Sequence, residues 1–213
     1  MQEPKSENIT RQETRVTRAE RERLLGQRGV TLWFTGLSAS GKSTIAALVD
    51  QMLHRRGRYC CVLDGDNIRF GLNRDLGFSP QDRAENIRRI GEVAKLLTQN
   101  GAIALTAFIS PYRADRDRNR AIHEPGDFIE VFVDCPLEVC ERRDPRGLYA
   151  KARAGQIPEF TGISAPYEIP LKPELTLRTD RETPPESAAR VMAFLEARGH
   201  LKNRFAMAVA DRG

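Results

Sequence analysis

The sequence predicts an α/β fold in three layers, in which a mostly parallel sheet carries helices on both faces. Short runs of apolar and β-branched residues, typical of strands buried on both sides, alternate with longer segments whose apolar residues recur at helical spacing. No internal repeat interrupts this alternation. The 213 residues, 40% of them hydrophobic and 30% charged, suit one domain with a substantial core.

A phosphate-binding loop is the strongest local signal. Residues 36–44 read Gly-Leu-Ser-Ala-Ser-Gly-Lys-Ser-Thr and match the pattern G-x-x-x-x-G-K-[ST]. The preceding run, residues 30–35, is apolar and β-branched and predicts a buried strand. After the loop, apolar residues recur at i, i+3, i+4, i+7 and i+8 from Ile45, which predicts a helix with a left-handed cap at Gly57. This order predicts a P-loop NTPase fold rather than a glycine-rich turn with an exposed lysine.

The residue types in this loop explain its chemistry. Gly36 and Gly41 let the backbone turn tightly, so that N–H groups and the positive end of the helix point at phosphates. Lys42 reaches the β and γ phosphates, and the Ser43 hydroxyl is offered to Mg²⁺. The predicted nucleotide-binding residues are Gly36, Leu37, Ser38, Ala39, Ser40, Gly41, Lys42, Ser43 and Thr44.

The remaining chain continues the alternation of strands and helices. A helix begins after Ser79, because this serine is a good N-cap and Pro80 suits the first helical position. Its inner face is marked by Ile87, Ile90, Ala94 and Leu97. Further buried strands are expected over 59–63, 102–109, 128–133 and 175–179, with helices over about 112–122 and from 184 to Gly199.

Residues 142–173 form an insert rich in glycine, proline and charge. A structureless insert of this length in a compact domain is more often a functional lid than a disordered surface loop. Its apolar anchors support a lid; they are Leu148, Tyr149, Ile157 and Phe160. The predicted organisation is a charged helical arm over 1–28, a domain over 29–199 that contains the lid, and a tail over 200–213 that is a candidate for disorder.

Charge and cysteine usage exclude several function classes. The net charge is +5, but basic and acidic residues are interleaved, so a nucleic-acid-binding face is not predicted and an anionic small substrate explains the arginines. The longest apolar run, 102–109, is too short to span a bilayer, and the N-terminus resembles no signal or transit peptide. We therefore expect a cytoplasmic protein without membrane contact.

The four cysteines include no C-x-x-C pair and are interpreted as reduced thiols; they are Cys60, Cys61, Cys135 and Cys140.

Two acids, Asp64 and Asp66, follow the second expected strand. Ligands in open α/β sheets bind at the carboxyl ends of strands, so these carboxylates are expected beside the phosphates. One of them suits Mg²⁺ held through water, and we assign this role to Asp64. The other suits orientation of an attacking hydroxyl in line with the γ phosphate. The alternative, two acids in a plain turn, is weaker beside a phosphate loop. No Asn-Lys-x-Asp sequence is present, which argues against a GTPase.

Taken together, these motifs resemble the adenylyl-sulfate kinases. The resemblance is carried by residues 32–44, 63–69, 76–89, 108–113, 144–149, 159–163 and 167–170. It implies a nucleoside-kinase-like fold and ATP-dependent phosphorylation of the 3′-hydroxyl of adenosine 5′-phosphosulfate, with Mg²⁺. The products that the resemblance implies are 3′-phosphoadenosine 5′-phosphosulfate and ADP, in sulfate assimilation.

The resemblance also implies roles for individual side chains. Asp66 matches the catalytic aspartate, and Lys42 is the second catalytic candidate. Phe78 and Phe160 match an aromatic clamp on the substrate adenine. The complete implied substrate set is Asp66, Arg69, Phe78, Arg83, Asn86, Ile109, Ser110, Arg146 and Phe160. Guanidinium groups in this set fit a phosphosulfate, because their planar forks match anionic oxygens better than lysine does.

Three positions need a separate interpretation. Ser110 matches a serine described in some bacterial members as a phosphoserine intermediate, but in-line transfer needs only positioning and charge neutralisation. We therefore interpret Ser110 as a substrate contact. Arg146 replaces the usual lid lysine, which leaves open whether Arg146 or Lys151 touches the substrate. Ala39 replaces a common glycine, and no loss is expected if that position does not require positive φ.

Two other readings remain. A different small-molecule P-loop kinase, for gluconate, shikimate or a nucleoside monophosphate, would share the loop and lid but not the segments 63–69 and 108–113 together. A regulatory module without catalysis would keep Lys42 but lose Asp66 or the arginines, and both are present. The expected partners are ATP, the phosphosulfate, a second copy in a homodimer to which the arm contributes, and a separate ATP sulfurylase.

Overall fold

The computed structural model describes residues 6–10, 12 and 14–201, and these residues contain one parallel sheet of five strands. The strand order is β2-β3-β1-β4-β5. Leu32 in the centre lies opposite Leu105 on one neighbour and Ile129 on the other. The strands are β1 (Val30–Thr35), β2 (Cys60–Asp64), β3 (Ile103–Ala107), β4 (Phe128–Asp134) and β5 (Leu175–Arg178).

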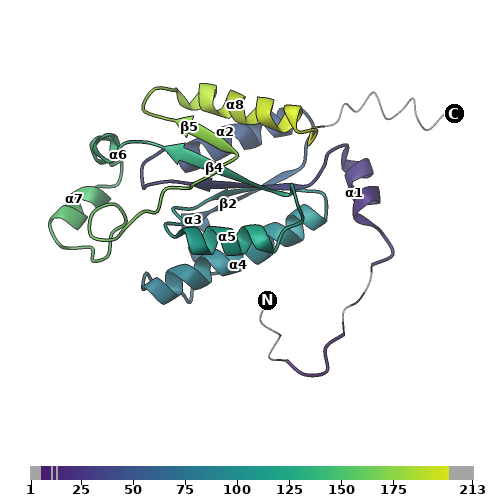
Figure 1. Cartoon of the computed structure of the whole chain (residues 1–213), viewed down its shortest axis with the longest axis horizontal. Coiled ribbons are helices and arrows are strands. Elements are labelled where there is room, and N and C mark those ends of the chain that lie inside the picture. The colour runs from purple at the N-terminus through teal and green to yellow at the C-terminus, as the bar shows by residue number, and fades with distance from the viewer. Residues whose placement is uncertain (1–5, 11, 13, 202–213) are drawn as a thin grey trace.

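Helices cover both faces of this sheet, which confirms the three-layer prediction (Figure 1). Helices α2 (Lys42–Arg55) and α8 (Pro184–Ala197) lie together on one face, and α4 (Pro80–Gln99) and α5 (Arg113–Ala121) lie on the other. The predicted signals are present: Ser79 caps α4, and Gly57 after α2 has a left-handed φ of 65°.

The core is divided by the sheet because strand side chains alternate between its faces. Leu32 and Phe34 belong to the apolar cluster that includes α2 and α8, whereas Trp33 belongs to the cluster under α4. All six residues of β1 are buried. A central strand that is apolar on both faces requires two covering layers, and both are present.

The edge strand β2 departs from the prediction. It was expected to be buried, but only Leu63 is buried and Val62 is 36% exposed. The reason is topological, because β2 has a neighbour on one side only. Apolar composition alone does not distinguish an edge strand from a central one.

The ends of the domain are partly helical. Helix α1 (Arg18–Leu25) confirms a helix within the expected charged arm, and Thr17 with Glu20 forms a capping box at its start. Arg18 donates to Asp127 Oδ1 at 3.0 Å, which fastens this helix to the domain.

Most of the expected tail, residues 202–213, lies outside the described residues. Among the helices that the structure describes, none combines the length and apolar character needed to cross a membrane.

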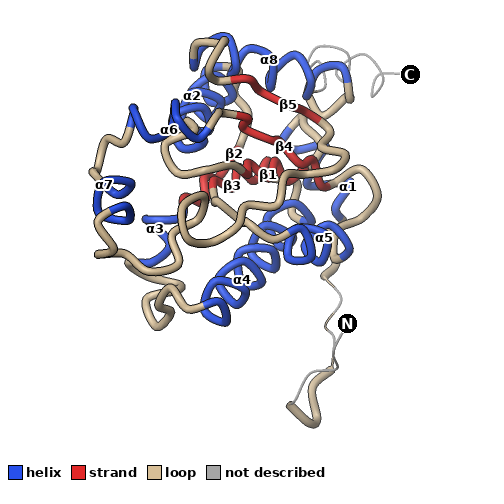
Figure 2. Tube along the Cα trace, turned by 60° about the vertical axis from the view of Figure 1, so that its left-hand side comes forward, coloured by secondary structure: helices blue, strands red, loops and turns tan. Residues whose placement is uncertain are grey.

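The insert between β4 and β5 is more ordered than expected. It was predicted to be structureless, but it contains α7 (Leu148–Arg153), preceded by α6 (Leu137–Arg143). Both project beyond the carboxyl ends of the strands (Figures 1 and 2). Tyr149 and Phe160 are buried and meet edge to face at 5.0 Å between ring centroids. Two of the predicted apolar anchors therefore form the lid's own small core.

Candidate functional site

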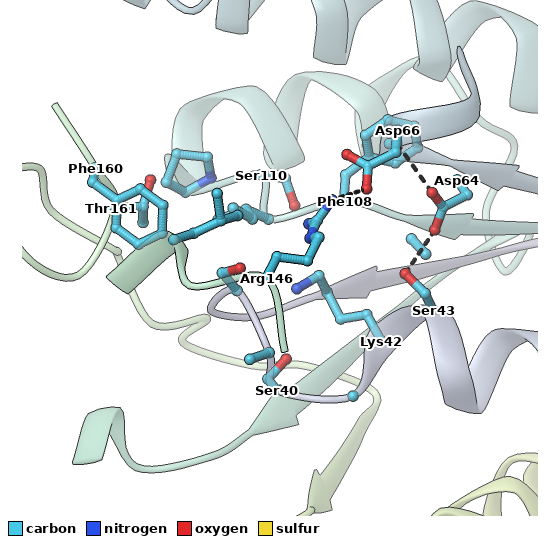
Figure 3. Close-up of a pocket in the computed structure, with 18 of the residues that line it drawn as sticks. Ser40, Lys42, Ser43, Asp64, Asp66, Phe108, Ser110, Arg146, Phe160 and Thr161 are labelled. Atoms are coloured by element: carbon cyan, nitrogen blue, oxygen red, sulfur yellow. Dashed lines mark hydrogen bonds and ion pairs between the residues drawn. The ribbon is translucent and has the colours of Figure 1, made fainter. Parts of the chain in front are cut away.

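A cavity of about 1680 Å³ opens at the carboxyl ends of β1, β2 and β3, as expected for a parallel sheet. Its floor is the phosphate-binding loop, and one wall is formed by α3 (Gly65–Arg69) and the start of α4. The lid forms the opposite wall through Pro145, Arg146, Leu148 and residues 156–161. Figure 3 shows Lys42, Ser43, Arg146 and both aspartates at one part of this cavity, with Phe160 and Thr161 at another.

The glycines of the loop are required by its path. A Cβ on Gly36 would lie 2.6 Å from the Val133 carbonyl oxygen, so no larger residue fits there. Gly41 has a left-handed φ of 104° at the N-cap of α2. Ser38 to Thr44 line the cavity, whereas Gly36 and Leu37 do not. Leu37 instead packs against the lid's apolar cluster.

Lys42 is folded back onto its own loop. Its Nζ donates to the carbonyl oxygens of Gly36 at 3.0 Å and Leu37 at 2.6 Å, and the residue is 8% exposed. Burial lowers the pKa of this ammonium group to about 8, and the nearby negative groups only partly offset that effect. An anion in the cavity would supply the counter-charge that Lys42 lacks.

Ser43 and Asp64 lie together beside Lys42. The Ser43 hydroxyl donates to Asp64 Oδ2 at 2.6 Å, and Asp64 Oδ1 accepts the N–H of Asp66 at 3.0 Å. Asp64 is therefore the N-cap of α3 and not part of a plain turn. The described residues contain no group of three or more His, Cys, Asp or Glu that could hold a metal. One hydroxyl and one carboxylate suit a Mg²⁺ that keeps most of its waters or binds phosphate oxygens.

Asp66 is joined to the lid. Its carboxylate forms an ion pair with the Arg146 guanidinium, and both side chains are more than half exposed (Figure 3). Lys151 is exposed and does not line the cavity, so the structure favours Arg146 over Lys151 as the lid cation at the site.

Two arginines line the cavity wall formed by α3 and the start of α4. Arg69 stacks on Phe78 with its guanidinium carbon 4.3 Å from the ring centroid, and burial lowers the pKa of Arg69. Arg83 bridges α4 and the lid, because it donates to the Phe78 carbonyl at 2.8 Å and to the Glu159 carbonyl at 2.7 Å. Phe78 is 68% exposed despite this contact with Arg69, so part of its ring is accessible to a planar ligand. Phe160, at 9%, is held in the lid.

Ser110 is brought to the cavity in a constrained conformation. Its φ is 40°, its Oγ accepts a hydrogen bond from Trp33 Nε1 at 3.1 Å, and the residue is only 2% exposed. No basic side chain is hydrogen-bonded to its Oγ among the described residues. These contacts agree with a positioned serine and supply no group to activate it as a nucleophile.

Arg116 is a structural residue at this site that the sequence analysis missed. It is 1% exposed, and its guanidinium donates to the carbonyl oxygens of Ser110 at 2.6 Å and Glu168 at 2.7 Å. It also forms an ion pair with Glu130 at 2.6 Å. One side chain thus joins the loop after β3 to the C-terminal end of the lid. An arginine-rich helix is typical of a solvent-exposed face, so the sequence pattern did not predict that Arg116 is buried.

Two further contacts that the sequence did not indicate join the phosphate loop to other elements. Tyr149 of the lid donates from its hydroxyl to the Ser38 carbonyl at 3.0 Å, and Thr179 does the same to the Ser40 carbonyl at 2.8 Å. The loop is therefore held from two sides.

Alanine at position 39 was expected to be harmless if this position does not require a positive φ, and that condition is not met. Its φ is 58°, in the left-handed region, so this position does require positive φ and an alanine there carries strain. The expectation of no loss rested on a normal backbone angle, which sequence alone does not report.

Comparison with known proteins decides the family. The family described as adenylylsulphate kinase matches residues 28–178 of the chain. The chain belongs to this family. An adenylyl-sulfate kinase of Staphylococcus haemolyticus is 54% identical over 191 residues, which cover 90% of this chain and 96% of that protein. One from Saccharomyces bayanus is 60% identical over 182 residues, 84% of this chain and 90% of that protein.

A solved structure gives the same result. The Mycobacterium tuberculosis APS kinase CysC, described in complex with AMPPNP and APS, superposes with a TM-score of 0.76 at 54% identity. The match covers 80% of this chain and 99% of that one. The P-loop kinase fold predicted from the sequence is thereby confirmed together with the adenylyl-sulfate kinase family.

Proposed function

We propose that this member of the adenylyl-sulfate kinase family transfers the γ-phosphate of ATP to the 3′-hydroxyl of adenosine 5′-phosphosulfate. The products are 3′-phosphoadenosine 5′-phosphosulfate and ADP, as in sulfate assimilation. The observation that supports this most strongly is one cavity lined both by the phosphate loop and by a wall carrying Asp66, Arg69, Phe78 and Arg83. A donor and an acceptor nucleotide would therefore meet at Asp66.

The phosphate loop supports ATP as the donor. The phosphate loop and the first residues of α2 line the cavity, and the N-terminal end of a helix favours anions. Lys42 would exchange its two carbonyl partners for the β and γ phosphates, and the added negative charge would return its pKa toward the ordinary lysine value. The complex of a relative with AMPPNP, a nucleotide analogue, is in line with this role.

The opposite wall supports an anionic adenine nucleotide as the acceptor. Arg69 and Arg83 supply guanidinium donors for a phosphosulfate, and the exposed Phe78 ring can stack on a base. Phe160 approaches the same cavity from the lid. The complex of that relative with APS supports this assignment.

Asp66 is the proposed catalytic residue between the two nucleotides. Its carboxylate would accept the hydrogen bond of the 3′-hydroxyl and orient that oxygen for in-line attack. Arg146 would leave Asp66 and move onto the developing charge of the transferred phosphoryl group or onto the phosphosulfate. Ser110 would contact the substrate without forming a covalent intermediate.

The Ser43 hydroxyl and the Asp64 carboxylate fit Mg²⁺ as the cofactor. Ser43 and Asp64 would hold it, and when bound it neutralises charge on the β and γ phosphates. Activity that survives exhaustive chelation by EDTA would contradict this assignment.

The assembly is proposed to be a cytoplasmic homodimer that receives its substrate from a separate ATP sulfurylase. Exposed apolar side chains available for a subunit contact include Leu24, Phe70 and Leu171. A relative from Thiobacillus denitrificans is described as a hexameric APS kinase, so higher assemblies occur in such structures. Sedimentation equilibrium separates monomer, dimer and hexamer, and a monomer at all concentrations would contradict the dimer.

Product formation tests the function. The purified protein is incubated with MgATP and adenosine 5′-phosphosulfate, beside parallel reactions with gluconate, shikimate and AMP. Phosphorylation of the phosphosulfate alone is the expected result. Phosphorylation of another acceptor would favour a different small-molecule kinase, and ATP binding without any transfer would favour a regulatory module.

A further inference from the structure

Asn73 is a buried polar side chain in contact with a residue of the cavity wall. It lies in the turn between α3 and α4 and is completely buried. Its Nδ2 donates a hydrogen bond of 2.9 Å to Oδ1 of Asn86, one of the residues that line the cavity. Its own Oδ1 is buried and has no partner among the described residues. A buried amide held by one bond to a cavity residue invites a functional explanation.

The hydrogen bond from Asn73 determines how the Asn86 amide is oriented. A carboxamide has one acceptor oxygen and one donor nitrogen. Asn73 occupies the oxygen, and Asn86 Nδ2 donates no hydrogen bond to another described residue. That nitrogen is not fully buried, and Asn86 lines the cavity, so the donor is open to the cavity. Asn86 therefore presents a donor to whatever binds there.

We propose that Asn73 is a positioning residue that fixes the Asn86 amide with its donor toward the acceptor substrate. The ligand group recognised at this point is then a hydrogen-bond acceptor, an oxygen of the ribose or the phosphosulfate. This inference rests on the proposed function for the identity of the substrate. It agrees with the neighbouring side chains, because Arg69 and Arg83 also line the cavity and carry only donors.

The turn that carries Asn73 is held by contacts other than this amide. The backbone N–H of Asn73 donates to the Ile68 carbonyl at 3.1 Å. Arg89 donates to the Leu72 carbonyl at 3.3 Å and forms an ion pair with Asp75 at 2.7 Å. A substitution that preserves the shape of Asn73 should therefore leave the turn and the fold in place.

The substitution Asn73→Asp tests the proposal, because it keeps the shape and removes the donor. A carboxylate at this position repels Asn86 Oδ1, so the Asn86 amide turns over and presents its oxygen to the substrate. The KM for adenosine 5′-phosphosulfate should rise about tenfold or more, and the KM for ATP should stay unchanged. The matched control is Asn100→Asp, which makes the same chemical change at an exposed residue.

The pH dependence of the defect is the distinguishing readout. A carboxyl group at a buried site has a raised pKa, and once protonated it donates a hydrogen bond as the asparagine does. The ratio of variant to wild-type KM for the phosphosulfate should therefore fall as the pH falls through that pKa. An equal KM for variant and wild type at every pH overturns the proposal. A pH-independent loss that affects both substrates equally, with a lowered Tm, also overturns it.

Side-chain amide hydrogen exchange gives a test that needs no activity. In the wild-type protein the NH₂ group of Asn73 should be protected and that of Asn86 should exchange faster. In Asn73→Asp the Asn86 NH₂ group should become protected, because it now donates to the new carboxylate. Protection of Asn86 in the wild type contradicts the proposal. Failure of the wild type to phosphorylate adenosine 5′-phosphosulfate would contradict the proposed function, and the exchange result would still decide the orientation.

Discussion

Arg146 of the lid forms an ion pair with Asp66 in α3, and this contact joins two residues that are 80 positions apart. Both side chains are more than half exposed, so the pair contributes at most about 1 kcal/mol. A weak contact of this kind is easily exchanged for contacts to a nucleotide. The same pair thus keeps a cation beside the proposed catalytic carboxylate before any substrate arrives.

Replacing this arginine should impair use of the acceptor. We expect Arg146→Ala to lower kcat/KM for adenosine 5′-phosphosulfate about tenfold to a hundredfold, because a charge-assisted hydrogen bond is lost. Arg146→Lys should recover part of that loss, since the positive charge returns without the fork. Steady-state kinetics with each substrate varied in turn provide the measurement. An alanine variant faster than the wild type would show that the ion pair only obstructs Asp66.

The depressed pKa of Lys42 predicts proton uptake on nucleotide binding. In the protein without nucleotide, Lys42 has a pKa of about 8, below the usual range for lysine. Above pH 8, most molecules of the unliganded protein therefore carry a neutral Lys42 amine. Bound phosphates favour the ammonium form, and MgATP should therefore draw in nearly one proton at pH 9 and almost none at pH 6.5. Calorimetry in buffers of different ionisation enthalpy measures this number. Lys42→Met should abolish the difference between the two pH values, and uptake that persists in this variant would assign the proton to another group.

Asp66 and Arg83 should affect different kinetic constants. Asp66→Ala is expected to lower kcat about a hundredfold or more, because we propose that the Asp66 carboxylate orients the attacking hydroxyl. Arg83→Ala is expected mainly to raise the KM for the acceptor, because Arg83 joins α4 to the lid on the acceptor side. Lys42→Ala should resemble the Asp66 variant. Full turnover in Asp66→Ala would remove the catalytic role of this carboxylate.

Ser110 should prove dispensable for chemistry. Its hydroxyl is buried and already accepts the Trp33 indole N–H, so Ser110→Ala should lower kcat by less than about tenfold, the value of one hydrogen bond. Intact-mass spectrometry of the wild-type protein with MgATP alone should show no phosphorylated species. A phosphoprotein in the wild type, together with an inactive alanine variant, would instead establish a covalent intermediate.

The left-handed backbone at Ala39 predicts a stabilising substitution. Ala39→Gly relieves strain in the phosphate loop at the expense of a more flexible unfolded chain, with an expected net gain of about 0.5 kcal/mol in the free energy of unfolding. Urea denaturation measures it. Ala46→Gly, in the buried interior of α2, is the control and should destabilise by about 1 kcal/mol or more. A loss of stability in both variants would mean that the Ala39 methyl contacts outweigh the strain.

Local signals account for the parts of the fold that were predicted correctly. The segment from Val30 to Arg55 has strand, glycine loop and helix in immediate succession, and each is specified by nearby residues. The edge position of β2 depends on strand order, which the spacing of apolar residues does not report. Helix α7 was missed because a helix of six residues is too short to show a periodic pattern.

The candidate site likewise contains residues that local motifs predicted and residues that they did not. Asp66, Arg69 and Arg83 stand in motifs, and the structure gathers them around one cavity. Arg116 and Asn73 act through partners that lie outside their own secondary-structure elements, and their types are those of ordinary surface residues. Positioning groups of this kind are recognised only once tertiary contacts are known.

The position of the transferred phosphate tests the central proposal most directly. The product of MgATP and adenosine 5′-phosphosulfate is isolated, and its ³¹P and ¹H NMR spectra identify which oxygen carries the new phosphoryl group. We predict phosphorylation at the 3′-oxygen alone, together with loss of that product in Asp66→Ala. A phosphoryl group on the 2′-oxygen, or ADP release without any phosphorylated nucleotide, would contradict the proposed reaction.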